Sequence, residues 1–130
     1  MDKASAVGHI PSGLFIICNK NQETSQIDGF LGSWVQQVSF SPLLVALCIK
    51  PGRPASDAII AGEVFTINVV GEHNKKYLKH FWSGYDPEKS PFEELEYTDH
   101  NGSISLNESM STITCKMTNT ISPGDHNIII

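Results

Sequence analysis

A turn that carries two cations is the first place where the residue types indicate chemistry. Lys50 and Arg53 flank the start of a predicted helix at Pro54, directly after an apolar segment. Backbone amides at a helix N-terminus form an anion site together with nearby cations. Proline removes one of these amides but leaves those of Ala55 and Ser56. The turn is therefore a candidate phosphate site, and a solvated Lys/Arg pair is the alternative.

His126 is the second candidate. It follows Gly124 and Asp125 at a predicted turn that leads into an apolar strand. An imidazole in that position can hydrogen-bond a ligand or change its charge near neutral pH. A turn histidine without a functional role is the alternative.

Several other chemistries lack their motifs. Neither the P-loop pattern G-x-x-x-x-G-K-[ST] nor the dinucleotide pattern G-x-G-x-x-G occurs in the sequence. His73 and His80 have no H-E-x-x-H or Cys/His spacing around them, so we expect no metal site. Ser33 and Ser39 lie outside any G-x-S-x-G elbow, which argues against a serine nucleophile.

Residues 29–42 are predicted to form a ligand-holding loop. The stretch mixes glycine, hydroxyl and amide side chains with Trp34, and it leads into an unbroken apolar run at residues 43–49. Polar groups beside so apolar a strand are typical of a binding loop on a rigid scaffold. Because residues 43–49 do not alternate, we expect a central strand that is covered on both faces.

The surrounding elements position these candidates. The hydrophobic pattern predicts strands at residues 14–18, 26–32, 64–70, 109–118 and 126–130, helices at 53–62 and 73–82, a loop at 83–92, and turns at 19–25 and 101–102. Gly29 and Gly32 indicate a bulge or the close approach of a ligand or another backbone. Asn68 has apolar neighbours, and either a structural backbone bond or a ligand contact would satisfy its amide.

The expected facing of two elements follows from their periodicity. In the strand at 109–118, Ile113, Cys115 and Met117 are predicted to point inward, and Thr112, Thr114, Lys116 and Thr118 outward. In the helix at 73–82, Tyr77, Leu78, Phe81 and Trp82 share the apolar face, and Lys75, Lys76 and Lys79 cover a solvated face.

Composition narrows the class of protein. The 130 residues suit one domain with a hydrophobic core, and a net charge of -5 makes duplex nucleic acid an unexpected partner. The apolar runs are too short for a bilayer and no signal-peptide pattern opens the chain, so we expect a cytoplasmic protein. The three cysteines lack CxxC spacing and are predicted to be buried thiols. Short strands with two helices predict an antiparallel barrel, closed or partly closed, with an α+β sandwich as the alternative.

Ordered motifs across nearly the whole chain resemble one family. They are the segments at residues 10–16, 32–42, 65–69 and 79–81 and the Gly-Asp-His sequence at 124–126. This order resembles the flavin reductase-like FMN-binding split-barrel proteins, and within them the flavin reductase module of cyanobacterial diflavin flavoproteins. The resemblance implies a single domain over residues 1–130 that is mainly β, an antiparallel split barrel with Greek-key character and short flanking helices.

The resemblance also implies a site. FMN would lie along residues 33–39, with its phosphate at residues 50–54. The implied cofactor-binding residues are Gly32, Ser33, Trp34, Val35, Gln36, Ser39, Phe40, Lys50, Arg53 and Pro54. His126 would orient the nicotinamide or the flavin ring. The family usually forms homodimers with the cofactor near the subunit interface, and a redox protein is a further implied partner.

The implied activity is hydride transfer from NAD(P)H to flavin. The cofactor supplies that chemistry and the protein supplies position and electrostatics, so no catalytic acid or base is required. The alternatives are an FMN-binding electron carrier without its own nicotinamide reaction, and a barrel that has lost its cofactor. Relatives continue past the Gly-Asp-His motif, whereas this sequence ends at Ile130. We therefore expect the barrel to be incomplete or completed by a partner.

Overall fold

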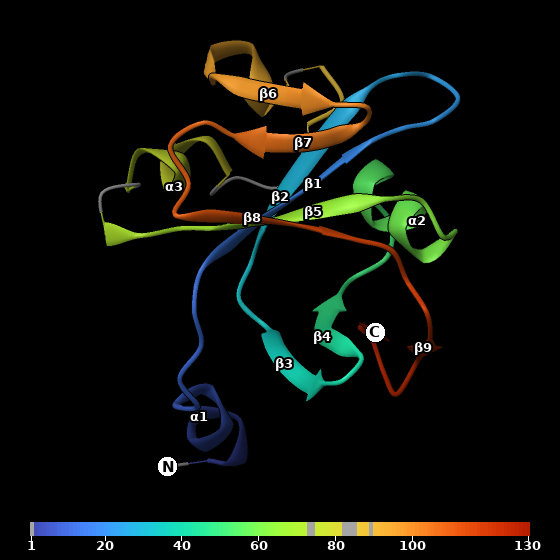
Figure 1. The fold of residues 1–130 in the computed structure, drawn as a ribbon. Coiled ribbons are helices and arrows are strands. Elements are labelled where there is room, and N and C mark those ends of the chain that lie inside the picture. Colours follow the sequence, from blue (N-terminus) through green and yellow to red (C-terminus); the bar gives the residue numbers. More distant parts are fainter. Residues whose placement is uncertain (1, 73–74, 82–85, 89) are drawn as a thin grey trace.

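The computed structural model describes residues 2–72, 75–81, 86–88 and 90–130. The chain forms two four-stranded antiparallel sheets and a two-stranded ribbon (Figure 1). The strands are β1 Phe15–Lys20, β2 Ile27–Gly32, β3 Val35–Phe40, β4 Leu43–Ile49, β5 Phe65–Val69, β6 Tyr97–His100, β7 Ser103–Leu106, β8 Ser111–Cys115, β9 Thr120–Ile121 and β10 Asn127–Ile129. The helices are α1 Lys3–Gly8, α2 Pro54–Ile60, α3 Lys75–Phe81 and the 3-10 helix η2 Pro91–Glu94.

The strand orders explain the division into two sheets. The first sheet has the order β2-β1-β5-β8 and the second the order β3-β4-β10-β9, while β6 and β7 form the ribbon. β1 thus lies between β2 and β5, although β3, β4 and α2 intervene in sequence. Figure 1 shows β3 and β4 at one end of the molecule and the ribbon at the other. The prediction of a mainly β, antiparallel domain is confirmed, and the described strands do not close into one continuous barrel.

Two hydrophobic cores lie on opposite faces of the first sheet. Ile16 of β1 belongs to a core completed by α3, η2 and β7, whereas its neighbour Ile17 belongs to a core shared with α2, β4 and β10. Successive strand residues point to opposite faces, so an unbroken apolar run suits a sheet covered on both sides. The buried strand predicted at residues 14–18 is confirmed with a small shift.

Most predicted boundaries hold. The hairpin of β1 with β2, helix α2 with proline at its start, strand β5 and a final strand after the turn at 122–125 are all present. Asn101 and Gly102 have φ values of 55° and 93°, the left-handed pair that joins β6 to β7. Tyr77 and Phe81 are buried on one side of α3, as predicted. Of the other residues in that prediction, His73 and Trp82 lie outside the described residues.

Three predictions about strands are wrong. Asn19 is not in a turn, because β1 continues to Lys20 and the buried Asn19 amide donates to the Val64 carbonyl at 3.0 Å. β4 is central in its sheet but is not covered on both faces, and Leu44, Ala46 and Cys48, which alternate with Val45 and the core residues Leu47 and Ile49, are only half-buried. The reason is that no layer of the described chain covers the outer side of the second sheet.

The third error concerns β8. Thr112, predicted to point outward, is half-buried, and its hydroxyl donates to the Asn68 side-chain oxygen at 2.8 Å. Ile113 shares the inward face of its partner Ile67, as predicted, but is 40% exposed because β8 is the edge strand of its sheet. Cys115 and Met117 do pack against the second core. The three cysteines are free thiols, but only Cys18 is fully buried as predicted, whereas Cys48 and Cys115 are half-buried. Among the described residues, no helix combines the length and apolar character needed to span a membrane.

Candidate functional site

The predicted ligand loop is largely a strand. β3 pairs with β4 in a hairpin, so residues 35–40 are extended and only the flanks of the stretch are irregular. A register shift lies between Gln37 and Ser39, and the Ser41–Pro42 peptide bond is cis. Val35 points toward the second core, while its neighbours Trp34 and Gln36 are exposed. Pairing with β4 satisfies the backbone of this stretch and fixes which side chains face outward.

These outward side chains form one surface, which we call the outer face. Directly paired residues share a face of a sheet, so the registers of β3, β4, β10 and β9 define it. Its strand residues are Gln36, Ser39, Leu44, Ala46, Cys48, Ile121 and Ile128. Trp34 and His126 extend it at the start of β3 and β10. The outer face is therefore mixed, with apolar side chains beside amide, hydroxyl and aromatic groups.

Residues from three distant segments meet at one corner of the outer face. The rings of Trp34 and His126 have centroids 4.8 Å apart and are inclined by 47°. His126 Nδ1 lies 2.8 Å from the Asp125 carboxylate, and that hydrogen bond is the main cause of the lowered pKa of Asp125. The nearby charge of Lys50 contributes to the same lowering of the Asp125 pKa. The structure thus brings Trp34, Lys50 and His126 together at this corner.

Arg53, in contrast, faces β2. Its guanidinium donates to both carboxylate oxygens of Asp28, at 2.9 Å and 3.3 Å, and to the Gly29 carbonyl at 2.7 Å. The Asp28 carboxylate also accepts a hydrogen bond from the Ala55 amide at 3.0 Å, so a side chain of β2 caps the start of helix α2. Pro54 occupies the first turn of α2, as predicted. The predicted phosphate turn is consequently divided, with Lys50 on the outer face and Arg53 held by an internal carboxylate.

Asp28 is the residue that sequence reasoning missed. Its side chain is only 8% exposed, although it carries an ionisable group. An aspartate inside a buried strand needs a cation or amide donors as partners, because an unpaired buried charge is costly. The position of Asp28 in a predicted strand, together with a nearby Arg53, could have indicated this ion pair from the sequence. The glycine signals reflect close packing within the chain. A Cβ on Gly29 would meet the Phe92 ring at 3.0 Å and the Ile17 backbone carbonyl at 3.1 Å, and one on Gly32 would meet the Ile17 side chain at 2.6 Å.

Asn68 has a structural role in the first sheet. Its side-chain nitrogen donates to the Ile16 carbonyl at 3.2 Å, and its oxygen accepts from the Leu106 amide at 3.0 Å and from Thr112. The side chain is fully buried, so both ends of the amide are satisfied within the protein. The structural explanation for Asn68 is confirmed.

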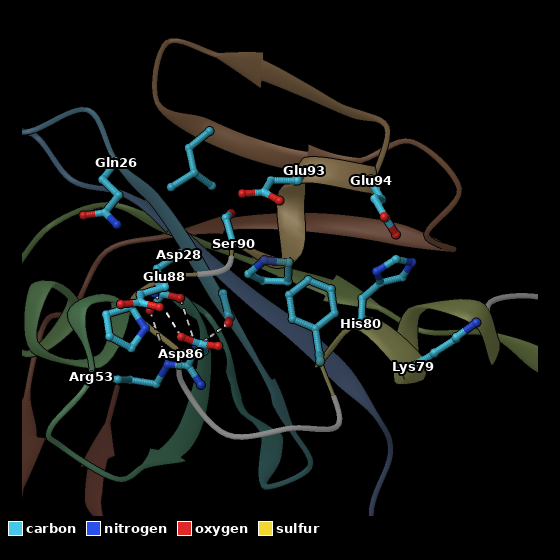
Figure 2. Close-up of a pocket in the computed structure, with 15 residues that line it drawn as sticks. Gln26, Asp28, Arg53, Lys79, His80, Asp86, Glu88, Ser90, Glu93 and Glu94 are labelled. Atoms are coloured by element: carbon cyan, nitrogen blue, oxygen red, sulfur yellow. Dashed lines mark hydrogen bonds and ion pairs between the residues drawn. The ribbon is translucent and has the colours of Figure 1, made fainter.

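A separate pocket of about 600 Å³ opens between β2, α3 and η2 (Figure 2). Figure 2 shows Arg53 at one end and Lys79 with His80 at the other. Much of its lining is acidic, with Asp28, Asp86, Glu88, Glu93 and Glu94. Such a lining disfavours a phosphate-bearing ligand. Within the described part of the chain, no group of His, Cys, Asp and Glu has the arrangement of a metal site.

Known proteins resemble this chain in sequence and in fold. The family described as "Flavin reductase like domain" matches residues 7–130. Diflavin flavoprotein A 1 of Nostoc sp. (strain PCC 7120) is 35% identical over 130 residues, which are 98% of this chain and 22% of that protein. The chain therefore spans about a fifth of the length of the curated relatives it matches.

Two solved structures share the fold. The NADH:FAD oxidoreductase SgcE6 of Streptomyces globisporus C-1027 superposes with a TM-score of 0.83 at 20% identity, covering 95% of this chain and 74% of that one. The styrene monooxygenase flavin reductase (SMOB) of Pseudomonas putida S12 gives 0.82 at 19% identity, covering 99% and 80%. These similarities confirm the predicted split-barrel class. Together with the family match over residues 7–130, they establish that the chain belongs to the flavin reductase-like family.

Proposed function

We propose that this protein is a flavin reductase that transfers a hydride from NAD(P)H to FMN. The observation that carries the proposal is the corner of the outer face, where Trp34, Lys50, Asp125 and His126 meet in a chain of this family. These residues come from three separate segments of the chain, and none belongs to a hydrophobic core. A cluster of this kind on a rigid sheet is typical of a binding site.

The residues at this corner fit a flavin. Trp34 is 56% exposed and presents an aromatic surface on which a planar ring can stack. Gln36 and Ser39 on β3, and Ser33 just before it, offer hydrogen-bonding groups, and Lys50 offers a cation. A bound flavin supplies the hydride acceptor, which is chemistry that the side chains lack. The protein's part is to bind and orient the two ligands.

Asp125 gives His126 a defined role. With the carboxylate as acceptor, Nδ1 of the imidazole carries the proton and Nε2 is left as the acceptor for a ligand. Contact with the Trp34 ring further restrains the imidazole. His126 is accordingly proposed to orient the nicotinamide or the flavin ring. This role requires no change in its protonation during hydride transfer.

The proposal includes a homodimer in the cytoplasm. Phe40 and Leu43, at the tip of the β3–β4 hairpin, are 89% and 73% exposed, and Val38 and Ile121 are about half exposed, at 50% and 52%. Exposed apolar groups gathered on one sheet mark an interaction surface in soluble proteins. A second copy of the chain would cover these side chains and would place the flavin near the interface.

Spectroscopy of the purified protein tests the proposal. We expect the protein fraction to show the absorbance of oxidised flavin after incubation with FMN and removal of free FMN by gel filtration. Anaerobic addition of NADH or NADPH should then bleach this absorbance. Replacement of His126 by Gln should slow the bleaching, whereas His9→Gln, at the end of the exposed helix α1, is the matched control. A protein that neither binds FMN nor consumes NAD(P)H in its presence would disprove the proposal.

The electron-carrier alternative has a specific observation in its favour. The curated relatives are diflavin flavoproteins, several times longer than this chain. A module of that kind can receive electrons from a protein donor instead of a nicotinamide. Bound FMN that a reduced redox protein bleaches, but that stays oxidised with both NADH and NADPH, would favour this alternative.

A further inference from the structure

The carboxylate of Asp28 occupies the position that an anion would take at the start of α2. It receives two hydrogen bonds from Arg53 and one from the Ala55 amide, at distances between 2.9 Å and 3.3 Å. The side chain is 8% exposed, and the Arg53 side chain is 20% exposed. A guanidinium and a helix amide that converge on one group are the donors that would otherwise hold a phosphate.

A second carboxylate engages the same turn. The Gly52 amide donates to Asp57 at 3.0 Å, so this backbone donor of the turn also has an acidic partner within the chain. Lys50 is exposed and lies near Asp125, whose pKa it helps to lower. A phosphate that met Lys50 would form a solvent-exposed ion pair next to an acid, and exposed pairs contribute little to affinity.

We propose that Asp28 is a specificity-determining residue, and that the protein recognises a flavin by its ring and ribityl chain and hardly by its terminal phosphate. Riboflavin, FMN and FAD are then accepted with similar affinity. The inference rests on the proposed function, because it concerns the flavin of that same site. It replaces the expectation that Arg53 and the α2 amides hold the phosphate.

Displacement of Asp28 by a ligand phosphate is unfavourable for a physical reason. The carboxylate would lose the guanidinium and the Ala55 amide while its surroundings stay buried. Removing one partner of a buried ion pair leaves an uncompensated charge, which costs more than a new exposed contact returns. The phosphate of a bound flavin is therefore expected to remain in solvent.

The wild-type protein decides the question. Fluorescence titrations measure the dissociation constants of riboflavin and FMN at the same ionic strength. We expect the two constants to agree within tenfold. FMN binding more than tenfold tighter than riboflavin would overturn the inference while leaving the proposed function intact. Failure of both flavins to bind would overturn the inference and the proposed function together.

A variant sharpens the test. Asp28→Asn keeps an oxygen for the Ala55 amide but removes the charge that pairs with Arg53. The preference for FMN over riboflavin should rise by about tenfold, because a phosphate is no longer repelled by the Asp28 charge and Arg53 loses its charged partner. The matched control is Asp99→Asn, which breaks the surface pair of Asp99 with Lys20 and should leave the preference unchanged. A folded Asp28→Asn protein with an unchanged preference would contradict the inference. If circular dichroism shows that this variant is unfolded, the wild-type ratio alone decides.

Discussion

The two sheets differ in which side chains they bury and which they expose. In the first sheet, Asn68, Thr66 and Asp28 are buried, and each has hydrogen-bond partners within the chain. In the second sheet, the outer face presents Trp34 and its apolar neighbours to solvent. The first sheet has a core on each face, whereas the second has a core on one face only.

This difference separates structural residues from candidate binding residues. A polar group inside the first sheet is there because its partners lie inside the protein, and its loss affects stability. An exposed aromatic or apolar group on the second sheet contributes little to the fold of one protomer. Its loss should instead affect ligands or a second copy of the chain. Substitutions in the two sheets can test this separation directly.

The largest effect is expected for Asn68→Leu in the first sheet. The substitution leaves the Ile16 carbonyl, the Leu106 amide and the Thr112 hydroxyl without their buried partner. We expect a loss of about 3 kcal/mol in the free energy of unfolding, or about 150-fold in the folding equilibrium. Urea denaturation followed by circular dichroism measures it.

Gln36→Leu on the outer face is the matched control, because the Gln36 side chain is exposed. Its effect on unfolding should stay within about 0.5 kcal/mol, which is usual for surface substitutions. A loss below about 1 kcal/mol for Asn68→Leu would contradict the view that the first sheet depends on its internal polar bonds.

The next effect concerns the proposed dimer. Phe40→Asp places a charge at the 89% exposed tip of the β3–β4 hairpin. If a second copy covers this tip, the dimer dissociation constant should rise by about 100-fold, since a buried aromatic anchor contributes more than 2 kcal/mol. Sedimentation analysis over a concentration series measures the constant. Met110→Asp, at a 73% exposed position next to the first sheet, is the control and should leave it unchanged. A wild-type protein that stays monomeric at high concentration would exclude the dimer.

Sequence patterns predicted the helices, strands and turns better than they predicted what packs against them. The apolar run at 14–18, the Asn101–Gly102 turn and proline at the start of α2 each depend on local preferences, and all three predictions are confirmed. The outer face of β4 could not be predicted in the same way, because a continuous apolar run does not state what covers it. The second sheet lacks that cover within the described chain, so Leu44, Ala46 and Cys48 are only half-buried.

The candidate site shows the same limit on sequence reasoning. The motif resemblance placed Trp34, Lys50 and His126 around one flavin, and in the structure Trp34 contacts His126 while Lys50 lies near Asp125. The resemblance did not predict that Asp28 on β2, 25 residues before Arg53, would form an ion pair with it. Which of two cations in one turn faces a ligand depends on tertiary pairing. Local spacing carries no information about that pairing.

A third prediction compares thiols in the two sheets. Burial raises the pKa of the Cys115 thiol in β8 from 9.0 to about 11. At pH 9 the thiolate fraction, and hence the alkylation rate, should be about 50-fold below that of a thiol with the ordinary pKa. Iodoacetamide labelling with peptide mass spectrometry measures the rate, and the urea-unfolded protein is the reference. A folded-state rate within fivefold of that reference would contradict the burial of Cys115. Added FMN should protect Cys48 on the outer face without affecting Cys115.

The smallest effect is expected for Trp34→Ala on the outer face. The indole is 56% exposed and contacts His126, so its removal takes away a stacking surface without opening a core. Flavin affinity should fall by about tenfold, the amount that an aromatic contact of about 1.4 kcal/mol provides. The free energy of unfolding should change by less than about 1 kcal/mol.

Tyr97→Ala is the matched control, because Tyr97 lies in the ribbon, packs edge-on against Phe92 of η2 and is remote from the outer face. A Trp34→Ala protein that is destabilised but binds flavin normally would reverse the comparison, because the second sheet would then use its aromatic residue for folding.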